Sequence, residues 1–217
     1  MTFWYLLHSF LQHTGAPPLD AGGPQRAVSL LLDDVLDGLC AEHFGAFEYA
    51  DPTTGVVDLD VVKEWVAMFD QANALNKTIA VKTWPGPEES PIDSLGPSWP
   101  SNFVDPVTKK PFNKTHAGIA AVAADLANYS MATYLCIAGK DSLFSYAWWY
   151  DVSEGYLPGD DAPSAWYPQF KMPIGDAIGG AVYTHGGQVC TRDFDRVSVY
   201  VNFSDFGSAL IHNHVSQ

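Results

Sequence analysis

Short apolar runs alternate with stretches of helical spacing between residues 24 and 155. In the helical stretches apolar residues recur every three or four positions, whereas the runs are continuously apolar and short enough for buried strands. Because such strands are typical of parallel sheets with helices on both faces, the alternation predicts an α/β fold. The predicted helices are Pro24–Asp37, Asp58–Leu75 and one that begins after Thr115, and the predicted strands are 38–44, Thr78–Trp84, Ala132–Gly139 and Phe144–Tyr150.

The C-terminal part of the chain follows a different pattern. Apolar and polar residues alternate over residues 181–212 between turn signals, which predicts an antiparallel β meander. We therefore expect a single domain over residues 1–217, in which β/α units (24–155) precede the meander. Three or four β/α units are too few for a closed (β/α)8 barrel, which takes about 250 residues. Two architectures remain open: a partial or reduced TIM barrel, and a smaller open sheet.

The charge and the cysteines exclude several classes of protein. The formal net charge is −14, which disfavours binding to nucleic acid or to an anionic membrane surface. No apolar run reaches the roughly 18 residues that a membrane-spanning helix needs. The three cysteines have no CxxC spacing, so neither a zinc finger nor a dense disulfide framework is expected. We interpret Cys40 and Cys136 as small apolar residues buried in strands.

The signals for a cellular compartment conflict. The N-terminal segment lacks the basic region and the small-residue cleavage site of a signal peptide. Four of the seven asparagines nevertheless lie in N-glycosylation sequons, which favours a secretory history with a signal lost upstream. These are Asn76, Asn113, Asn128 and Asn202. Asn76 and Asn202 adjoin apolar strand runs, where a glycan would be awkward, so the compartment stays open.

Polar and aromatic residues stand at the ends of the predicted strands, where parallel α/β folds place their active sites. They are Glu42 and His43 at the end of the first strand, Lys82 and Trp84 at the end of the second, Asp141 after the third, and Trp148, Trp149, Tyr150, Asp151 and Glu154 at or beyond the end of the fourth. Asp37 precedes its strand and therefore falls at the opposite edge, where residues serve stability.

Acids beside aromatic rings have a specific use in carbohydrate chemistry. Cleavage of a glycosidic bond needs one carboxyl group to protonate the leaving oxygen and a second to act as nucleophile or base. Apolar aromatic neighbours raise the pKa of a carboxyl group and so keep it protonated, and the same rings can stack on sugars. A purely structural interpretation also stays open, in which Glu42 pairs with Lys82 across adjacent strands.

The histidines give no clear metal site. His212 and His214 have H-x-H spacing near the terminus, which we interpret as incidental, and His185 lies in a Thr-His-Gly-Gly turn. No H-E-x-x-H, G-x-S-x-G or glycine-rich phosphate loop is present. No metal and no cofactor are predicted.

Four motifs resemble a largely uncharacterised family of glycoside-hydrolase-like TIM barrels. They are DGLCAEHFGAFE (37–48), KTWPG (82–86), YAWWYDVSEG (146–155) and TRDFDRVSVYVNFSDFGSALI (191–211). The resemblance runs from about Val35 to Ile211 and corresponds to the later part of such a barrel. It implies that Glu42 is a strand-end acid, that Lys82 and Trp84 line a pocket, and that the meander closes the chain.

The chain departs from the family in two respects. The first barrel strands are missing or reduced to the N-terminal 25 residues, and the Pro- and Ser-rich segment 85–114 is an elaboration. An incomplete barrel leaves open sheet edges, which tend to pair with another chain. We therefore expect either a homodimer that completes the fold or a truncated gene product whose activity is in doubt.

The leading hypothesis is a glycoside hydrolase that acts on a poly- or oligosaccharide. Glu42 is the candidate general acid or nucleophile, and Asp151 ranks ahead of Asp141 and Glu154 as the second carboxylate. His43 contacts substrate, and Lys82 binds a hydroxyl group or holds Glu42 ionised. The sugar platforms are Trp84, Trp148, Trp149 and Tyr150. The alternatives are a non-catalytic glycan-binding or degenerate barrel protein, and a metal-dependent hydrolase in which His43 converges with acids from neighbouring strands.

Overall fold

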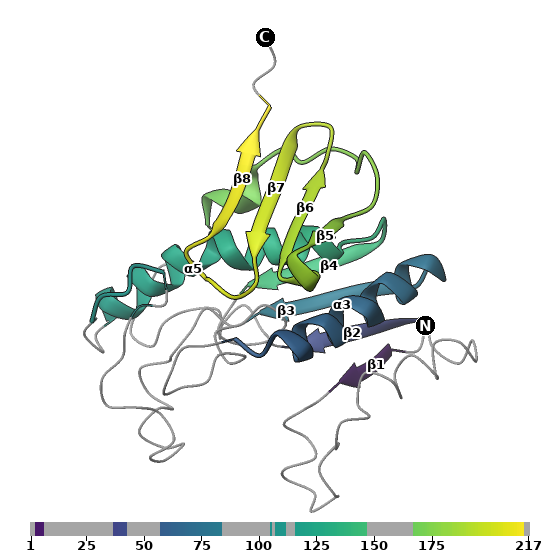
Figure 1. Cartoon of the computed structure of the whole chain (residues 1–217), viewed down its shortest axis with the longest axis horizontal. Helices are drawn as coiled ribbons and strands as arrows, with labels where there is room; N and C mark the ends of the chain where they lie inside the picture. The colour runs from purple at the N-terminus through teal and green to yellow at the C-terminus, as the bar shows by residue number, and fades with distance from the viewer. Residues whose placement is uncertain are drawn as a thin grey trace, which may run out of the picture.

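The computed structural model describes seven parts of the chain: residues 3–6, 37–42, 57–83, 105, 107–111, 116–146 and 167–214. For residues 3–6, 42 and 116–120 it describes the backbone alone. This part of the chain forms a parallel sheet, an antiparallel sheet and two α-helices (Figure 1). The fold is therefore mixed α/β, as the alternation of patterns predicted.

The parallel sheet has four strands in sequence order. They are β1 (Phe3–Leu6), β2 (Gly38–Glu42), β3 (Thr78–Thr83) and β4 (Ser142–Tyr146), and each pairs in parallel with the next. The predicted strands at 38–44 and Thr78–Trp84 are confirmed over Gly38–Glu42 and Thr78–Thr83, and the rest of each prediction lies outside the described residues. Only glycine fits at the start of β2, because a Cβ atom on Gly38 would collide with the carbonyl oxygen of Thr78. The described strands form an open sheet and do not close into a barrel.

The helix α3 (Leu59–Ala74) confirms the helix predicted between the first two strands. Asp58 caps it, since one of its carboxylate oxygens accepts hydrogen bonds from the amides of Asp60 (3.0 Å) and Val61 (3.3 Å). One apolar face of the helix packs into the core, where Val62, Val66, Met68, Phe69 and Ala72 are buried, while Trp65 is half-buried. At the other end of the helix, the side-chain amide of Asn73 donates to the carbonyl oxygen of Ile137 at 2.9 Å.

The helix α5 (His116–Ile137) corrects the sequence-based assignment most clearly. The predicted helix after Thr115 is confirmed, but it continues through residues 132–137, which were predicted to be a strand. Nearly every residue from Val122 to Ala138 is half-buried or buried. A helix that is enclosed on all sides shows no amphipathic period, so its apolar second half resembles a buried strand. None of the helices in the described ranges is both long and apolar enough to cross a membrane.

The C-terminal part forms the predicted antiparallel meander. Its strands are β5 (Val182–Thr184), β6 (Val189–Asp193), β7 (Val197–Asn202) and β8 (Ala209–Asn213), and each pairs antiparallel with the next. Two short 3₁₀ helices, η2 (Pro168–Lys171) and η3 (His185–Gly187), flank β5. The inner face of β7 is strictly apolar, with Val197, Val199 and Val201 buried.

The helix α5 lies between the two sheets and joins them into one core (Figure 1). On the side of the parallel sheet, the Tyr134 ring stacks on Phe144 with centroids 4.7 Å apart. On the side of the meander, the Tyr129 hydroxyl donates to the carbonyl oxygen of Phe203 at 3.0 Å, and its ring contacts Phe206. The meander is therefore packed on the β/α part through α5.

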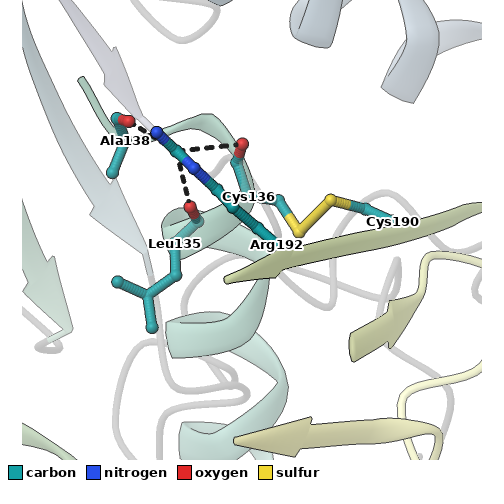
Figure 2. Close-up of a disulfide and its surroundings, with 5 residues drawn as sticks. All are labelled: Leu135, Cys136, Ala138, Cys190 and Arg192. Atoms are coloured by element: carbon teal, nitrogen blue, oxygen red, sulfur yellow. Dashed lines mark hydrogen bonds between the residues drawn. A yellow bond between two sulfur atoms is a disulfide. The ribbon is translucent and has the colours of Figure 1, made fainter. Parts of the chain in front are cut away.

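A disulfide fastens the end of α5 to the meander. Cys136 in α5 is bonded to Cys190 in β6, which corrects the interpretation of Cys136 as a free core residue in a strand. Beside the bond, one terminal nitrogen of Arg192 donates to the carbonyl oxygens of Leu135 (2.9 Å), Cys136 (3.4 Å) and Ala138 (2.6 Å), as Figure 2 shows. A cation at this position satisfies carbonyl groups that a helix end leaves unpaired and complements the helix dipole.

Candidate functional site

The carboxyl edge of the parallel sheet brings together two of the strand ends that the sequence singled out. Glu42 in β2 pairs in register with Lys82 in β3, and Lys82 pairs with Ser145 in β4. Paired strands lie about 5 Å apart. Positions 42 and 82 are therefore neighbours on one face of the sheet, as expected of two adjacent strand ends.

Lys82 is unusual because it is buried, with an exposed fraction of 6%. Strand alternation places it on the face opposite Ile79 and Val81, which pack into the core against the helices. Lysine is rarely buried unless another group compensates for the hydration that its ammonium group loses. A carboxylate at position 42 is in register to provide that compensation.

The last residue of β4 fixes the edge of the sheet onto α5. Thr83 is fully buried and pairs with Tyr146, which is also buried. The Tyr146 hydroxyl donates to the carbonyl oxygen of Ala123 at 2.6 Å. Burial raises the pKa of Tyr146 well above its ordinary value, so the ring is a neutral anchor. Its role is to hold the strand end in place.

A second carboxyl pair, which the sequence did not indicate, lies on the α5 side of this edge. It consists of Asp105 and Asp125. Asp105 is buried and accepts hydrogen bonds from the Val107 amide at 2.8 Å and from the Thr108 hydroxyl. Partial burial raises the pKa of Asp125, and both the charge of Asp105 and a hydrogen bond between the two side chains raise it further.

The Asp105–Asp125 pair lies on the helix-covered side of the sheet, whereas Lys82 is on the opposite face. The charge of Asp125 reaches the ring of Tyr146, whose side chain is on the helix-covered face of the sheet. Only the local turn around Asp105 could have been expected from the sequence, because aspartate followed by Pro, Val and Thr favours a side-chain-to-backbone turn. Its contact with α5 is a tertiary feature with no local signal.

The placement predicted for Asp141 was wrong. We expected it at the carboxyl end of a strand over 132–139, but those residues belong to α5 and the loop after it. Asp141 instead directly precedes β4, so it lies at the amino edge of the parallel sheet. The length of a five-residue strand, roughly 15 Å, separates it from the edge where Lys82 lies.

Most of the other predicted site residues lie outside the described ranges. For Glu42 the structure gives the backbone position alone. The residues without a described position are His43, Trp84, Trp148, Trp149, Tyr150, Asp151 and Glu154. The fourth predicted strand is confirmed for Phe144–Tyr146 and begins two residues earlier, at Ser142.

The C-terminal histidines form a small polar cluster on the meander. The Ser198 hydroxyl donates to a carboxylate oxygen of Asp193 at 2.6 Å and lies 2.8 Å from Nε2 of His214. Because the hydroxyl proton points to Asp193, the ring nitrogen donates to the serine oxygen and does not act as its base. His185 begins a 3₁₀ turn, as predicted. Within the described ranges, no three side chains are grouped as ligands for a metal ion.

No protein-family model matches the sequence, and a comparison with curated proteins finds no match.

Proposed function

We propose that the chain is a carbohydrate-active enzyme, a glycoside hydrolase on a TIM-barrel-derived fold, with Glu42 as its first carboxylate. The observation that carries the proposal is the register of position 42 with buried Lys82 at the carboxyl edge of the parallel sheet. In parallel α/β folds this edge is where active sites form. A buried ammonium group there needs an anionic neighbour, and a glycosidase needs an ionised carboxylate.

The charge of Lys82 favours one of the two roles for Glu42. A cation next to a carboxylate lowers its pKa and keeps it ionised, which suits a nucleophile or a base and disfavours a general acid. The second carboxyl group would then donate the proton, and Asp151 remains the leading candidate for it. A separation of about 5–5.5 Å between the two groups would make the enzyme retaining, and about 6.5–9.5 Å would make it inverting.

One experiment tests this proposal directly. Release of reducing ends is measured on a panel of neutral and acidic polysaccharides for the wild type, Glu42→Gln and Glu64→Gln. Glu64 is an exposed residue of α3 and serves as the matched control. Loss of the carboxylate at position 42 should reduce the rate on the order of 10²- to 10⁴-fold. Activity that survives Glu42→Gln would refute the assignment of Glu42.

The open sheet favours a second candidate function, a non-catalytic glycan-binding protein. The described strands form a four-stranded sheet, whereas a complete barrel of this class has eight. If no polysaccharide in the panel is cleaved but one is retained on an affinity matrix, this candidate replaces the hydrolase. Loss of retention in Glu42→Gln would then place the binding site at the same edge.

A further inference from the structure

The asparagines of the sequons differ in burial and in the hydrogen bonds that their side chains make. Asn128 lies in α5 and is half-buried, and its side-chain nitrogen donates to the carbonyl oxygen of Ala209 in β8 at 2.7 Å. A glycan on this nitrogen would have to occupy the interface between α5 and the meander. Asn113 lies outside the described residues.

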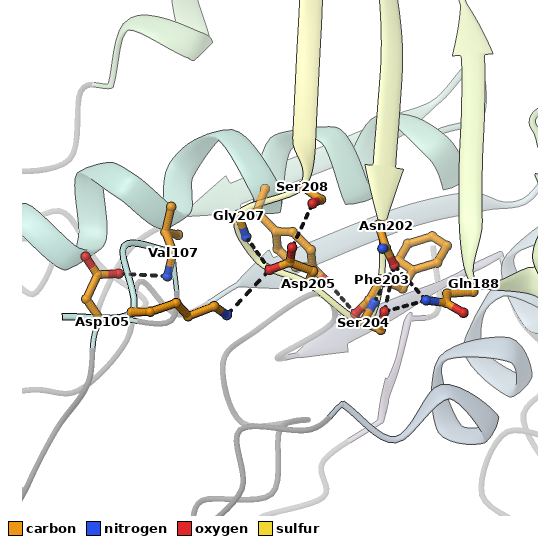
Figure 3. A network of polar contacts seen from close by, with 11 residues as sticks. Asp105, Val107, Gln188, Asn202, Phe203, Ser204, Asp205, Gly207 and Ser208 are labelled. Atoms are coloured by element: carbon orange, nitrogen blue, oxygen red, sulfur yellow. Dashed lines mark hydrogen bonds and ion pairs between the residues drawn. The ribbon is translucent and has the colours of Figure 1, made fainter.

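Asn202 is the last residue of β7, and its side chain forms part of the turn that leads to β8. Its side-chain oxygen accepts hydrogen bonds from the Ser204 amide (3.1 Å), the Ser204 hydroxyl (2.8 Å) and the side-chain amide of Gln188 (3.3 Å), as Figure 3 shows. Asn202 is half-buried within this network. The asparagine and the serine of this sequon therefore stabilise the turn, because the serine donates hydrogen bonds to the asparagine side chain.

Asn76 differs from both, because its side chain is exposed and makes no hydrogen bond within the described part of the chain. It follows α3 with φ of 53°, the left-handed conformation that asparagine tolerates at the end of a helix. Its amide donates to the carbonyl oxygen of Asn73 at 3.0 Å, and the amide of Lys77 donates to that of Ala72 at 2.9 Å. The backbone is thus fixed and presents the side chain to solvent.

This geometry corrects the expectation that the neighbouring strand would make a glycan at Asn76 awkward. β3 begins only at Thr78, and the left-handed turn precedes it. Asn76 lies at the amino edge of the parallel sheet, roughly 15 Å along β3 from Lys82. A glycan at this position would leave the carboxyl edge accessible.

The disulfide is an independent indication of the compartment. Disulfides form and persist mainly in oxidising environments such as the secretory pathway and are rare in the cytosol. Cys136 and Cys190 are joined across 54 residues, between α5 and β6. N-glycans are attached in that same pathway, so the bond and the exposed sequon point to one compartment.

We propose that Asn76 carries an N-linked glycan and that Asn128 and Asn202 do not. The donor is an oligosaccharide linked through pyrophosphate to a lipid. The side-chain nitrogen of Asn76 forms a bond to the anomeric carbon of the first sugar and gives up one proton. The bond between that carbon and the pyrophosphate oxygen breaks, and the lipid pyrophosphate leaves with its electron pair. No oxidant or reductant takes part.

The test is secretion of the full chain from a eukaryotic cell behind a secretion signal, followed by digestion with a peptide-N-glycosidase. Peptide mass mapping should show conversion of asparagine to aspartate at position 76 and at neither 128 nor 202. Asn76→Gly should abolish the modification at this position and still fold, because glycine suits a left-handed turn. Thr78→Val, which keeps the shape of the side chain but removes the sequon hydroxyl, should abolish it as well.

Two results would overturn the proposal. One is a secreted chain with an intact disulfide between Cys136 and Cys190 in which Asn76 is unmodified. The other is a glycan at Asn128 or Asn202, which would mean that hydrogen bonding in the folded chain does not indicate which sequon is used.

Discussion

At the residue scale, the molecule contains ionisable groups that stabilise it and others that cost stability. Asp205 belongs to the first kind. Hydrogen bonds from Ser208 and Gly207 and the nearby Lys109, whose ammonium group lies 3.4 Å away, lower its pKa (Figure 3). Asp125 belongs to the second kind, since partial burial and the neighbouring Asp105 raise its pKa. A raised carboxyl pKa means that the ionised form destabilises the folded state.

Asp125→Asn should therefore stabilise the protein at neutral pH. Asparagine removes the repulsion and can still donate a hydrogen bond to Asp105. Because Asp125 is exposed to solvent, the expected gain in the free energy of unfolding is below about 1 kcal/mol. The gain should disappear as the pH falls below about 4, where the wild-type carboxyl group is protonated in the folded and the unfolded chain.

Urea denaturation of the wild type and of Asp125→Asn between pH 3 and 8 measures this difference in the free energy of unfolding. Asp141→Asn is the control, because Asp141 is exposed in the turn before β4 and should shift the midpoint little at any pH. A lower midpoint for Asp125→Asn at pH 7 would show that the pair stabilises the fold.

At the element scale, the sequence predicted those elements whose burial follows a regular period. The helix α3 has one buried face and β7 has alternating burial, so both were assigned from spacing alone. The second half of α5 was not assigned as a helix, because it is enclosed by a sheet on each side and therefore shows no periodic burial. The wrong assignment of residues 132–137 also gave a wrong position for one candidate site residue. Asp141 was placed at the wrong edge, whereas Glu42 and Lys82 lie at the carboxyl ends of correctly assigned strands.

The disulfide and the carboxyl pair could not be predicted for a different reason. Cys136 and Cys190 are 54 residues apart, and the pairing of Asp105 with Asp125 likewise depends on how the segment before α5 packs against it. Such long-range contacts leave no local pattern in the sequence. Residue types alone could not show which cysteine is bonded and which is not.

The Cys136–Cys190 bond should contribute strongly to the attachment of the meander. Closing a loop of this length lowers the entropy of the unfolded chain by an amount equivalent to about 4 kcal/mol. The double variant Cys136→Ala/Cys190→Ala should therefore lose up to that much unfolding free energy in guanidinium denaturation. Cys40→Ser is the control, because Cys40 lies outside the bond. A double variant as stable as the wild type would show that α5 and β6 are held by packing alone.

At the scale of the whole molecule, one apolar core spans the parallel sheet, α5 and the meander. Five of its tyrosines are distributed over these layers. They are Tyr129 and Tyr134 in α5, Tyr146 in β4, Tyr167 just before η2 and Tyr183 in β5. Burial is the main cause that raises the pKa of each, to about 12 for Tyr134 and Tyr167 and further for the others. Ionisation of these tyrosines can therefore be used to follow the unfolding of the parallel sheet, α5 and the meander in one measurement.

These tyrosines predict how the whole chain unfolds in alkali. In the unfolded chain tyrosine ionises near pH 10. The folded state then binds more protons than the unfolded state above that pH, so its stability is complete below about pH 10 and falls as the pH rises through 12. The part of the tyrosinate absorbance that comes from these five tyrosines should appear together with the loss of far-ultraviolet circular dichroism, in a single transition. Tyr167→Phe should lose stability less steeply above pH 10, because burial alone raises the pKa of that hydroxyl group. If the absorbance of these five tyrosines rises in two steps, with the meander retained after the first, the two sheets unfold separately.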